Sequence, residues 1–578
     1  MAISPILLVT FFSLIYGNYV IPIEATHHVY TTLDESLSSE YSSNQPYRTA
    51  YHFQPLKNWI NDPNGPMRYG GLYHLFYQYN PKGAVWGNIV WAHSVSKDLV
   101  NWTPLDHAIH PSQPSDINGC WSGSATLLPG GKPVILYTGI DPNNHQVQNL
   151  AIPKNISDPL LREWKKSPKN PLMQPTFSNK INSSSFRDPT TAWLGKDGFW
   201  RVLIGSKINT KGMAILYKSK NFVNWVEAKH PLHSAEGTGM WECPDFYPVL
   251  NQNKLTIGVD TSVNGDYVKH VLKVSLDDTK HDHYLIGTYD AVKDIFVPDN
   301  HGLEGNHQYF ELRYDYGKYY ASKTFFDDGK NRRVLLGWVN ESSSVADDVK
   351  KGWSGIHTIP RAIWLHKSGK QLVQWPVKEI ENLRMNPVNW PTKVIKGGEL
   401  IPITGVNPVQ ADVEISFEVN DVGKAEILDH MIDPQILCSQ KGAAVKGRVG
   451  PFGLLVVASK GLQEYTAVFF RIFRYQHKNL VLMCSDQSRS SLNKENDMTT
   501  YGTFVDVDPL HEKLSLRSLI DHSVVESFGG EGRACITARV YPTLAIHDKA
   551  MLYAFNNGTS AVKITRLNAW SMKKAKIN

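Results

Sequence analysis

The sequence predicts an all-β protein with two large domains, a β-propeller followed by a β-sandwich. The chain has 578 residues, which exceeds the size of one ordinary domain. Short apolar runs are broken by Gly, Pro, Asn and Asp, and helical periodicity over about 12 or more residues is absent. Near residue 376 the pattern changes to a clean alternation of polar and apolar residues. This change predicts a domain boundary.

The N-terminus predicts a secreted protein. Residues 5–16 form an apolar run that is too short to span a bilayer and has the length of a signal-peptide core. We expect a signal peptide at about residues 1–25, with Gly17 and Ala25 as alternative cleavage points, and a polar leader over 26–47. Sequons for N-glycosylation, which favour secretion, occur at Asn101, Asn155, Asn182, Asn340 and Asn557.

Composition limits the classes of partner. Hydrophobic residues at 42% and charged residues at 20% indicate a soluble globular protein, and no later segment predicts a membrane span. The net charge of +6 suggests weak ionic attachment to an acidic matrix, such as an acidic polysaccharide. Lys and Arg are scattered and form no nucleic-acid-binding signature, so we expect no nucleic-acid partner.

The cysteines predict neither a disulfide scaffold nor a metal site. Five cysteines are few for a secreted chain of this length, and their spacings match no zinc pattern. Cys438 and Cys484 lie in the same C-terminal region and could pair, whereas Cys120 and Cys243 each lie close to a tryptophan. We expect no cofactor and no metal.

Residues 48–375 predict the propeller. Strands are expected at 71–79, 89–95, 133–139, 199–205 and 319–325. Segments 96–102 and 219–225 share one order of residues, in which a Ser-Lys turn is followed by an Asn-Trp end. They predict the same hairpin in two blades, and this repetition favours a propeller over a barrel.

The C-terminal part predicts a linker and a sandwich. Residues 374–384 are expected to be helical, with the linker at 376–385 and the sandwich over 386–578. Strands that alternate with period two, as a two-sheet sandwich requires, are expected at 413–419, 466–473, 524–528, 534–540 and 561–565. Asp521, His522 and Glu526 lie among them and are interpreted as structural, because no motif of turn and aromatic residues surrounds them.

The strongest candidate site surrounds an aspartate in residues 58–66. Asp62 lies between Asn61 and Asn64, with Trp59 before it and Pro63 after it. We expect Asp62 to end a strand and Asn64-Gly65 to form a turn. The amides can donate hydrogen bonds to the carboxylate, and the tryptophan suits the apolar face of a sugar ring.

Two further carboxylates lie in similar surroundings. Asp188 follows Arg187 and precedes a proline, and Glu242 follows Trp241. If a blade takes roughly 50–65 residues, these carboxylates lie about two blades and three blades after Asp62. All three side chains are therefore expected to project into one central funnel.

Two carboxyl groups on opposite sides of a glycosidic bond are the usual minimum for glycoside hydrolysis. Asp62, which has amide neighbours, suits the ionised nucleophile. Glu242, for which we expect a less polar setting beside Trp241, suits the protonated acid. Asp188 is expected to stay ionised beside Arg187 and to stabilise the oxocarbenium-like charge.

Taken in order, these motifs resemble glycoside hydrolase family 32, which contains the plant acid invertases and fructan exohydrolases. The resemblance extends from about residue 48 to the end and includes residues 61–65, 86–88, 121–126, 187–189 and 241–244. It implies a five-bladed propeller, a C-terminal sandwich and retention of anomeric configuration. It implies that Asp62 is the nucleophile, Glu242 the acid/base and Asp188 the transition-state stabiliser.

The resemblance also implies that the fructosyl site is lined by Asn61, Gln78, Trp86, Ser122 and Arg187. Trp59 and Trp121, which lie in the same motifs, complete the predicted substrate-binding set. For Gln78 and Ser122, a role in the strand alone is an equal alternative. Pro244 resembles the cell-wall branch of the family, which predicts an extracellular protein of the cell wall.

The sequence favours sucrose as the substrate. Asp277 and Lys280 match a pair that supports the glucose side of sucrose in family members that cleave it, although a solvated charged turn is the alternative. Hydrolysis of inulin- or levan-type fructans is the main competing prediction, followed by a non-catalytic sugar-binding role and by fructosyl transfer. A small protein inhibitor is an implied partner. Residues 299–313 depart from the family pattern and are expected to alter a loop or a blade edge.

Overall fold

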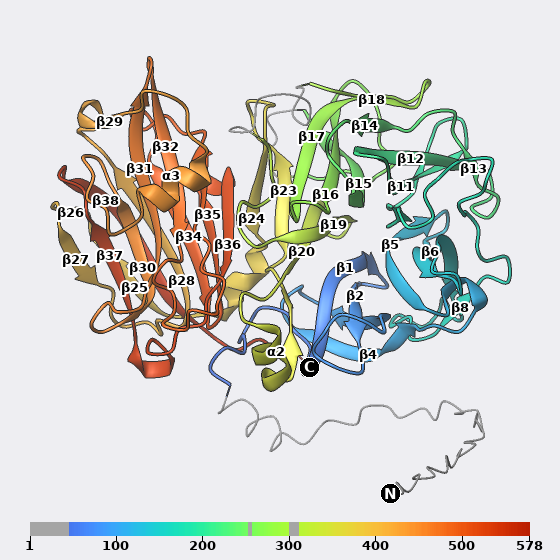
Figure 1. Ribbon diagram of the computed structural model, residues 1–578, viewed down its shortest axis with the longest axis horizontal. Helices are drawn as coiled ribbons and strands as arrows, with labels where there is room; N and C mark the ends of the chain where they lie inside the picture. The colour runs from blue at the N-terminus through green and yellow to red at the C-terminus, as the bar shows by residue number, and fades with distance from the viewer. Residues whose placement is uncertain (1–44, 252–256, 300–310, 578) are drawn as a thin grey trace, which may run out of the picture.

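The computed structural model describes residues 45–251, 257–299 and 311–577, and it shows a propeller beside a sandwich (Figure 1). The expected signal peptide, most of the leader and most of the unusual 299–313 segment lie outside the described residues. The end of the leader packs on the fold, because Trp353 Nε1 donates to Gln45 Oε1 at 2.6 Å and Tyr47 O–H donates to the Pro542 carbonyl at 3.0 Å.

Within the described residues, five sheets form the blades of the propeller, as the resemblance implied. Blade 1 contains β1 (Asn58–Tyr69), β2 (Leu72–Asn80), β3 (Val90–Ser96) and β4 (Trp102–Ile109). Blade 2 contains β5 (Gly119–Leu128), β6 (Lys132–Ile140), β7 (Gln146–Pro153) and β8 (Trp164–Lys166). Blade 3 contains β9 (Phe186–Arg187), β10 (Trp193–Leu194), β11 (Trp200–Ile208), β12 (Lys211–Ser219), β13 (Val226–Glu227) and β14 (His233–Ala235).

The remaining blades complete the ring. Blade 4 contains β15 (Trp241–Leu250), β16 (Val268–Leu276), β17 (His281–Asp290) and β18 (Ile295–Pro298). Blade 5 contains β19 (Tyr320–Asp327), β20 (Arg332–Val339), β22 (Ile356–His357), β23 (Arg361–Leu365) and β24 (Leu372–Pro376). Helix α2 (Val345–Lys351) leads into β21 (Trp353–Ser354), which pairs in parallel with β1 and joins the last blade to the first. The inner strands β1, β5, β9, β15 and β19, one from each blade, thereby surround one axis.

The hairpin predicted from the sequence repeat is present in both blades. Leu99 and Phe222 adopt left-handed φ values of 65° and 62° at corresponding positions. Trp102 Nε1 donates to the Leu99 carbonyl at 3.2 Å, and Trp225 Nε1 donates to the Phe222 carbonyl at 3.3 Å. The tryptophan therefore fixes the turn that precedes it.

The expected turn at Asn64-Gly65 is wrong. Strand β1 continues from Asn58 to Tyr69, and its pairing with β2 shifts register between Ile60 and Pro63 and again between Asn64 and Met67. These bulges accommodate a proline that cannot donate to the ladder. Asp62 therefore lies inside a bulged inner strand rather than at its end.

The C-terminal part is a sandwich of two seven-stranded sheets. One contains β25 (Arg384–Trp390), β26 (Lys393–Ile395), β28 (Gln410–Glu418), β34 (Leu514–Asp521), β35 (Val524–Gly529), β36 (Ala534–Arg539) and β38 (Val562–Met572). The other contains β27 (Glu399–Pro402), β29 (Glu426–Ile427), β30 (Phe452–Ser459), β31 (Thr466–Tyr475), β32 (Lys478–Asp486), β33 (Tyr501–Val505) and β37 (Ala550–Asn556). An apolar core from both sheets, which includes Val413, Phe452 and Phe470, fills the space between them.

Two details refine the prediction for this part. Helix α3 (Pro434–Gln440) carries Cys438, which forms a disulfide with Cys484 in β32. The region expected to be a helical linker is shorter than predicted, because residues up to Pro376 belong to β24, only Lys378–Leu383 form a 3-10 helix, and β25 begins at Arg384. Pairing with neighbouring strands extends β24 and β25 into the expected linker.

A buried ionic cluster joins the propeller to the sandwich. His52 Nδ1 lies 2.9 Å from Asp521 Oδ2, and His52 Nε2 lies 2.9 Å from Glu526 Oε1. Arg361 donates to Glu526 at 2.6 Å and to Asp315 at 2.9 Å, and these side chains are fully buried. Both ring nitrogens of His52 face carboxylates, which only a protonated ring satisfies. Asp521 and Glu526 thus serve in the domain interface.

The cluster predicts a stability maximum on the acid side of neutrality. Burial opposes the charge on His52, but the hydrogen bonds that its ring donates to Asp521 and Glu526 outweigh this effect and raise its pKa. The stabilisation is therefore complete below about pH 6.5 and is lost as pH rises through the raised pKa. Burial alone would raise the pKa values of Asp521 and Glu526. The hydrogen bond and charge of His52 outweigh burial at Asp521, and the charge of Arg361 outweighs it at Glu526, so both pKa values are lowered. Their contribution is present above about pH 4 and is lost as pH falls.

Substitution of His52 tests this prediction. His52→Gln leaves two buried carboxylates without their shared cation, so it should lower the free energy of unfolding by about 3 kcal/mol. It should also flatten the decline in stability above about pH 6.5, measured by denaturant unfolding across pH. His230→Gln at an exposed histidine is the control. An unchanged slope in His52→Gln would contradict the assignment.

Candidate active site

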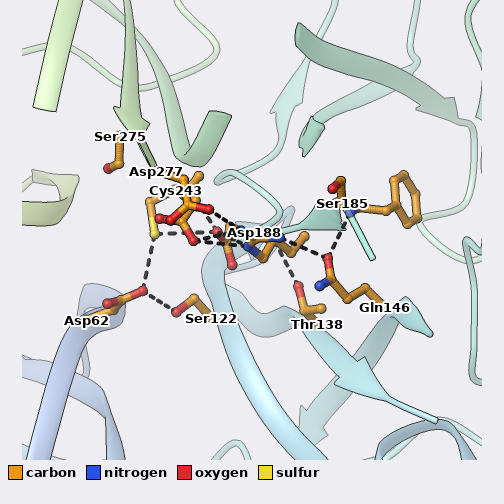
Figure 2. A network of polar contacts seen from close by, with 12 residues as sticks. Asp62, Ser122, Thr138, Gln146, Ser185, Asp188, Cys243, Ser275 and Asp277 are labelled. Atoms are coloured by element: carbon orange, nitrogen blue, oxygen red, sulfur yellow. Dashed lines mark hydrogen bonds and ion pairs between the residues drawn. The ribbon is translucent and has the colours of Figure 1, made fainter. Parts of the chain in front are cut away.

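Asp62 is held by donors from three inner strands, and Figure 2 shows two of them, Ser122 and Cys243. Asn61 Nδ2 donates to Asp62 Oδ1 at 3.0 Å, and Ser122 Oγ, from β5, donates to Oδ2 at 2.6 Å. The Cys243 thiol, from β15, donates to the same Oδ2 at 3.2 Å. Hydrogen bonds from several donors fix the orientation of a carboxylate. The carboxylate is thus preorganised.

Asp188 lies beside the same thiol. It follows β9 with a left-handed φ of 68°, and its amide donates to Thr138 Oγ1 at 2.8 Å. Cys243 N–H donates to Asp188 Oδ2 at 2.9 Å, so one residue contacts both aspartates. The side chain is almost completely buried.

The expectation that Arg187 keeps Asp188 ionised is wrong at mildly acid pH. Burial raises the pKa of Asp188 to about 6; the Arg187 guanidinium opposes this rise, while the Glu242 and Asp62 carboxylates add to it. Arg187 Nε lies 4.0 Å from Asp188, because the guanidinium is directed to Glu242 instead. In the free site Asp188 therefore carries a proton below about pH 6.

Glu242 has a strongly polar setting, contrary to the expectation from its tryptophan neighbour. Arg187 Nη2 and Nε donate to Glu242 Oε1 at 2.7 and 3.2 Å. The Tyr320 hydroxyl donates to Oε2, and Lys280 Nζ lies 3.7 Å from the same oxygen. Trp241 is fully buried under the strand and leaves the carboxylate to these partners. The sequence could not show this, because Arg187 and Tyr320 come from other blades.

The charged pair predicted for the glucose side lies next to Glu242. Lys280 forms an ion pair with Asp277, and Asp277 Oδ2 lies 3.8 Å from Arg187 Nη2. Lys280 Nζ also lies 5.4 Å from the centre of the Tyr320 ring. Burial opposes ionisation of Asp277, but the hydrogen bond and charge of Lys280 lower its pKa. The pair lies in an exposed turn, residues 277–280, and it also adjoins Glu242 and Arg187.

The aromatic candidates lie in two groups. Trp59 Nε1 donates to Asn61 Oδ1 at 2.8 Å and its ring lies edge-on to Trp338, with ring centres 5.7 Å apart. Trp86 packs edge-on against Trp121 at 5.7 Å and is 56% exposed, which leaves an aromatic face open to a ligand.

Gln78 is hydrogen-bonded to the backbone next to the site. It is buried, and its Nε2 donates to the Cys120 carbonyl at 3.3 Å, next to Trp121. Ser122, in contrast, contacts Asp62.

Sequence reasoning missed contacts that the fold brings together. The Cys243 thiol and the Tyr320 hydroxyl contact Asp62 and Glu242, and Gln146 Oε1 accepts from Arg187 Nη1 at 3.2 Å. The sequence contains no local signal for Tyr320, which looks like any strand tyrosine. For Cys243, adjacency to Glu242 was the available signal.

The predicted glycosylation sites differ in exposure. Asn155 and Asn182 are exposed, whereas Asn101, Asn340 and Asn557 are partly buried. Asn101 Nδ2 donates to Asp98 at 2.7 Å, and Asn557 Nδ2 donates to the Ala443 carbonyl at 3.0 Å. Glycan attachment stays a prediction.

Among the described residues, no helix is long and apolar enough to cross a membrane and no group of three or more His, Cys, Asp or Glu side chains is placed to hold a metal ion.

The arrangement can perform displacement at a glycosidic carbon. It provides a preorganised carboxylate, a second carboxyl group bound to tyrosine and arginine, and a buried aspartic acid between them. These groups suit a nucleophile, a proton shuttle and a hydroxyl ligand respectively.

Comparisons with known proteins agree with the motifs. Residues 52–376 match the Glycosyl hydrolases family 32 N-terminal domain and residues 379–571 match the family 32 C-terminal domain. The chain is 86% identical to a cell wall isozyme of β-fructofuranosidase from Pisum sativum over 96% of this chain and 99% of that one. It is 62% identical to a fructan 6-exohydrolase from Beta vulgaris over 93% of this chain and 88% of that one.

A solved structure agrees as well. The crystal structure of fructan 1-exohydrolase IIa from Cichorium intybus matches with a TM-score of 0.90 and 55% identity, over 92% of this chain and 98% of that one. The matches cover both domains, so this chain belongs to glycoside hydrolase family 32 and is a β-fructofuranosidase of that family.

Proposed function

We propose that this β-fructofuranosidase hydrolyses sucrose to glucose and fructose with retention of configuration, as a secreted protein of the cell wall. The observation that carries the proposal is the single network that links Asp62, Asp188 and Glu242 through Cys243 and Arg187 (Figure 2). Asp277 and Lys280 adjoin it on the Glu242 side, where a leaving glucose would be bound. The name of the pea relative supports the cell-wall location.

The reaction has two steps. The Asp62 carboxylate attacks the anomeric carbon of the fructosyl unit while Glu242 gives its proton to the glycosidic oxygen, so that glucose leaves and a covalent fructosyl ester forms. Glu242, now ionised, then takes a proton from water, which attacks the same carbon and frees Asp62. Asp188 binds fructosyl hydroxyls, and its hydrogen bond strengthens as positive charge develops. Trp59 and Trp86 offer faces for the sugar rings.

Exohydrolysis of fructans is the second candidate. The beet and chicory relatives carry that name, and the chicory enzyme was also crystallised with 1-kestose. The Asp277–Lys280 pair favours sucrose, because both side chains are held beside the acid/base candidate. A small protein inhibitor and acidic polysaccharide remain proposed partners.

A substrate panel tests the proposal. At mildly acid pH, purified protein should release glucose from sucrose faster than fructose from inulin or levan, and early product analysis should show the β-anomer of fructose. Intact sucrose together with trimmed fructan would support the exohydrolase instead.

The Asp277→Ala variant refines this test. Loss of the carboxylate that holds Lys280 should raise KM for sucrose by about tenfold and change fructan kinetics much less. Asp278→Ala, at the exposed neighbouring aspartate, is the matched control. Equal effects of Asp277→Ala on all substrates would contradict a glucose-side role.

A further inference from the structure

Two buried lysines lie beneath the acid/base strand and are not used by the mechanism above. Lys273 in β16 is fully buried and Lys323 in β19 is 2% exposed. Lys273 Nζ donates to the Cys243 carbonyl at 3.0 Å, and Lys323 Nζ donates to the Pro244 carbonyl at 3.1 Å. The two carbonyls that follow Glu242 are therefore each bound by a buried ammonium group.

These carbonyls belong to a backbone irregularity. The β15–β16 pairing shifts register between Glu242 and Asp245, and Cys243 has a left-handed φ of 43°. Residues other than glycine rarely adopt this conformation, and it persists only where surrounding contacts hold it. The bulge aims Glu242 at the site, so whatever holds the bulge also positions the carboxyl group.

The ammonium group of Lys273 also contacts a second backbone irregularity. Lys273 Nζ donates to the Ser322 carbonyl at 2.7 Å and lies 3.2 Å from Asp282, which is also fully buried. Asp282 accepts from the amides of Ala321 at 3.1 Å and Ser322 at 2.9 Å, and from the Ser322 hydroxyl. Ala321 has a left-handed φ of 53°, and the β19–β20 pairing shifts register between Tyr320 and Lys323. This second bulge directly follows Tyr320, the donor to Glu242.

Ser275 completes the link between the two charges. Lys273 Nζ donates to Ser275 Oγ at 2.8 Å, and Ser275 Oγ donates to Asp282 at 2.6 Å. Ser275 lies opposite Glu242 in the ladder. The ammonium group thus has hydrogen-bond acceptors for all of its protons, and the carboxylate has donors on both oxygens. A buried ion pair costs desolvation, and a fully satisfied one can specify a single geometry.

We propose that Lys273, with its partner Asp282 and with Lys323, positions the acid/base pair by holding the bulge after Glu242 and the bulge after Tyr320 in one fixed relation. The inference rests on the proposed function, because it assigns these residues to the proton-transfer half of the reaction. They do not touch the substrate and act through Glu242 and Tyr320.

The dependence of kcat/KM on the leaving group distinguishes a residue that positions the acid from a residue that only supports the fold. Sucrose needs a proton on its leaving oxygen, whereas an aryl β-fructofuranoside with an acidic phenol needs little acid assistance. Lys273→Gln should therefore lower kcat/KM for sucrose by about 30-fold or more and that for the aryl substrate by less than about fivefold. A loss of scaffold integrity would lower both equally.

The chain offers a matched control. Lys166 is a nearly buried lysine in β8, the outer strand of blade 2. It also donates to a carbonyl, a hydroxyl and a carboxylate, which belong to His110, Ser112 and Asp116. Lys166→Gln should lower Tm to a similar extent and leave the ratio of the two kcat/KM values at the wild-type level. Lys323→Met is the second test variant; among the described residues, Lys323 Nζ has the Pro244 carbonyl as its one hydrogen-bond acceptor.

Each outcome decides the inference. A selective loss on sucrose in Lys273→Gln, or in Lys323→Met if Lys273→Gln does not fold, supports it. Equal losses on both substrates in the folded variant overturn it. Wild-type protein that cleaves the aryl fructoside but leaves sucrose intact would overturn the proposed substrate, and a fructan such as inulin would then replace sucrose in the same comparison.

Discussion

Asp62→Ala is expected to lower kcat for sucrose by about 10⁴-fold or more, because no other group can form the covalent fructosyl ester. The carboxylate accepts hydrogen bonds from Asn61, Ser122 and Cys243, and these bonds fix the orientation of its two oxygens for attack. Steady-state kinetics at mildly acid pH measure the effect, and the fold should remain intact because Asp62 is only partly buried and its hydrogen bonds are with side chains of the site.

Ser122→Ala provides the graded comparison for Asp62→Ala. It removes the 2.6 Å hydrogen bond to Asp62 and keeps the nucleophile, so a loss of about tenfold is expected. Mass spectrometry of protein that is denatured during turnover should find a fructosyl group on a peptide that contains Asp62. Turnover by Asp62→Ala at the wild-type rate would show that another group attacks.

Glu242→Gln is expected to lower kcat for sucrose by about 10³-fold, because glutamine can accept from Arg187 but has no proton to give the leaving glucose. For an aryl β-fructofuranoside with an acidic phenol, the rate of the first step should fall by a far smaller factor. Added azide should speed the second step, because it attacks the fructosyl ester without a general base. Kinetics on both substrates, with and without azide, measure these effects.

The controls for Glu242→Gln follow from its contacts. Tyr320→Phe keeps the carboxyl group and removes only its phenolic donor, so it should be impaired less than Glu242→Gln on sucrose. The ratio of sucrose to aryl activity in Glu242→Gln also sets the upper limit for the Lys273 and Lys323 variants. A uniform loss on both substrates, with no response to azide, would contradict an acid/base role.

Much of the fold is encoded locally. The alternation of polar and apolar residues marks the strands, and the recurrent order of serine, asparagine and tryptophan marks the hairpins at Leu99 and Phe222, because a tryptophan that bonds back to the preceding turn needs only neighbours in the chain. The motifs around Asp62, Asp188 and Glu242 are likewise short stretches. Their order along the chain indicates which blades carry them.

The chemistry of the site depends on contacts between blades. The sequence placed Arg187 beside Asp188, but the guanidinium is directed to Glu242, and burial then raises the pKa of Asp188 to about 6. The sequence suggested an apolar setting for Glu242, but Tyr320 from the next blade supplies a hydroxyl. The orientation of a side chain and its loss of hydration depend on the residues that pack against it, and a local sequence pattern does not predict those residues.

By itself, the sequence therefore determined the strand pattern, the repeated hairpins and the domain order, and it singled out the three carboxylates as candidates for catalysis. Only the tertiary structure decided that β1 bulges at Asp62 instead of turning, that Cys243 contacts both aspartates, and that Lys273 and Asp282 lie beneath the acid/base strand. The physical reason is that strand register, left-handed bulge residues and buried charges are stabilised by partners far away in the chain.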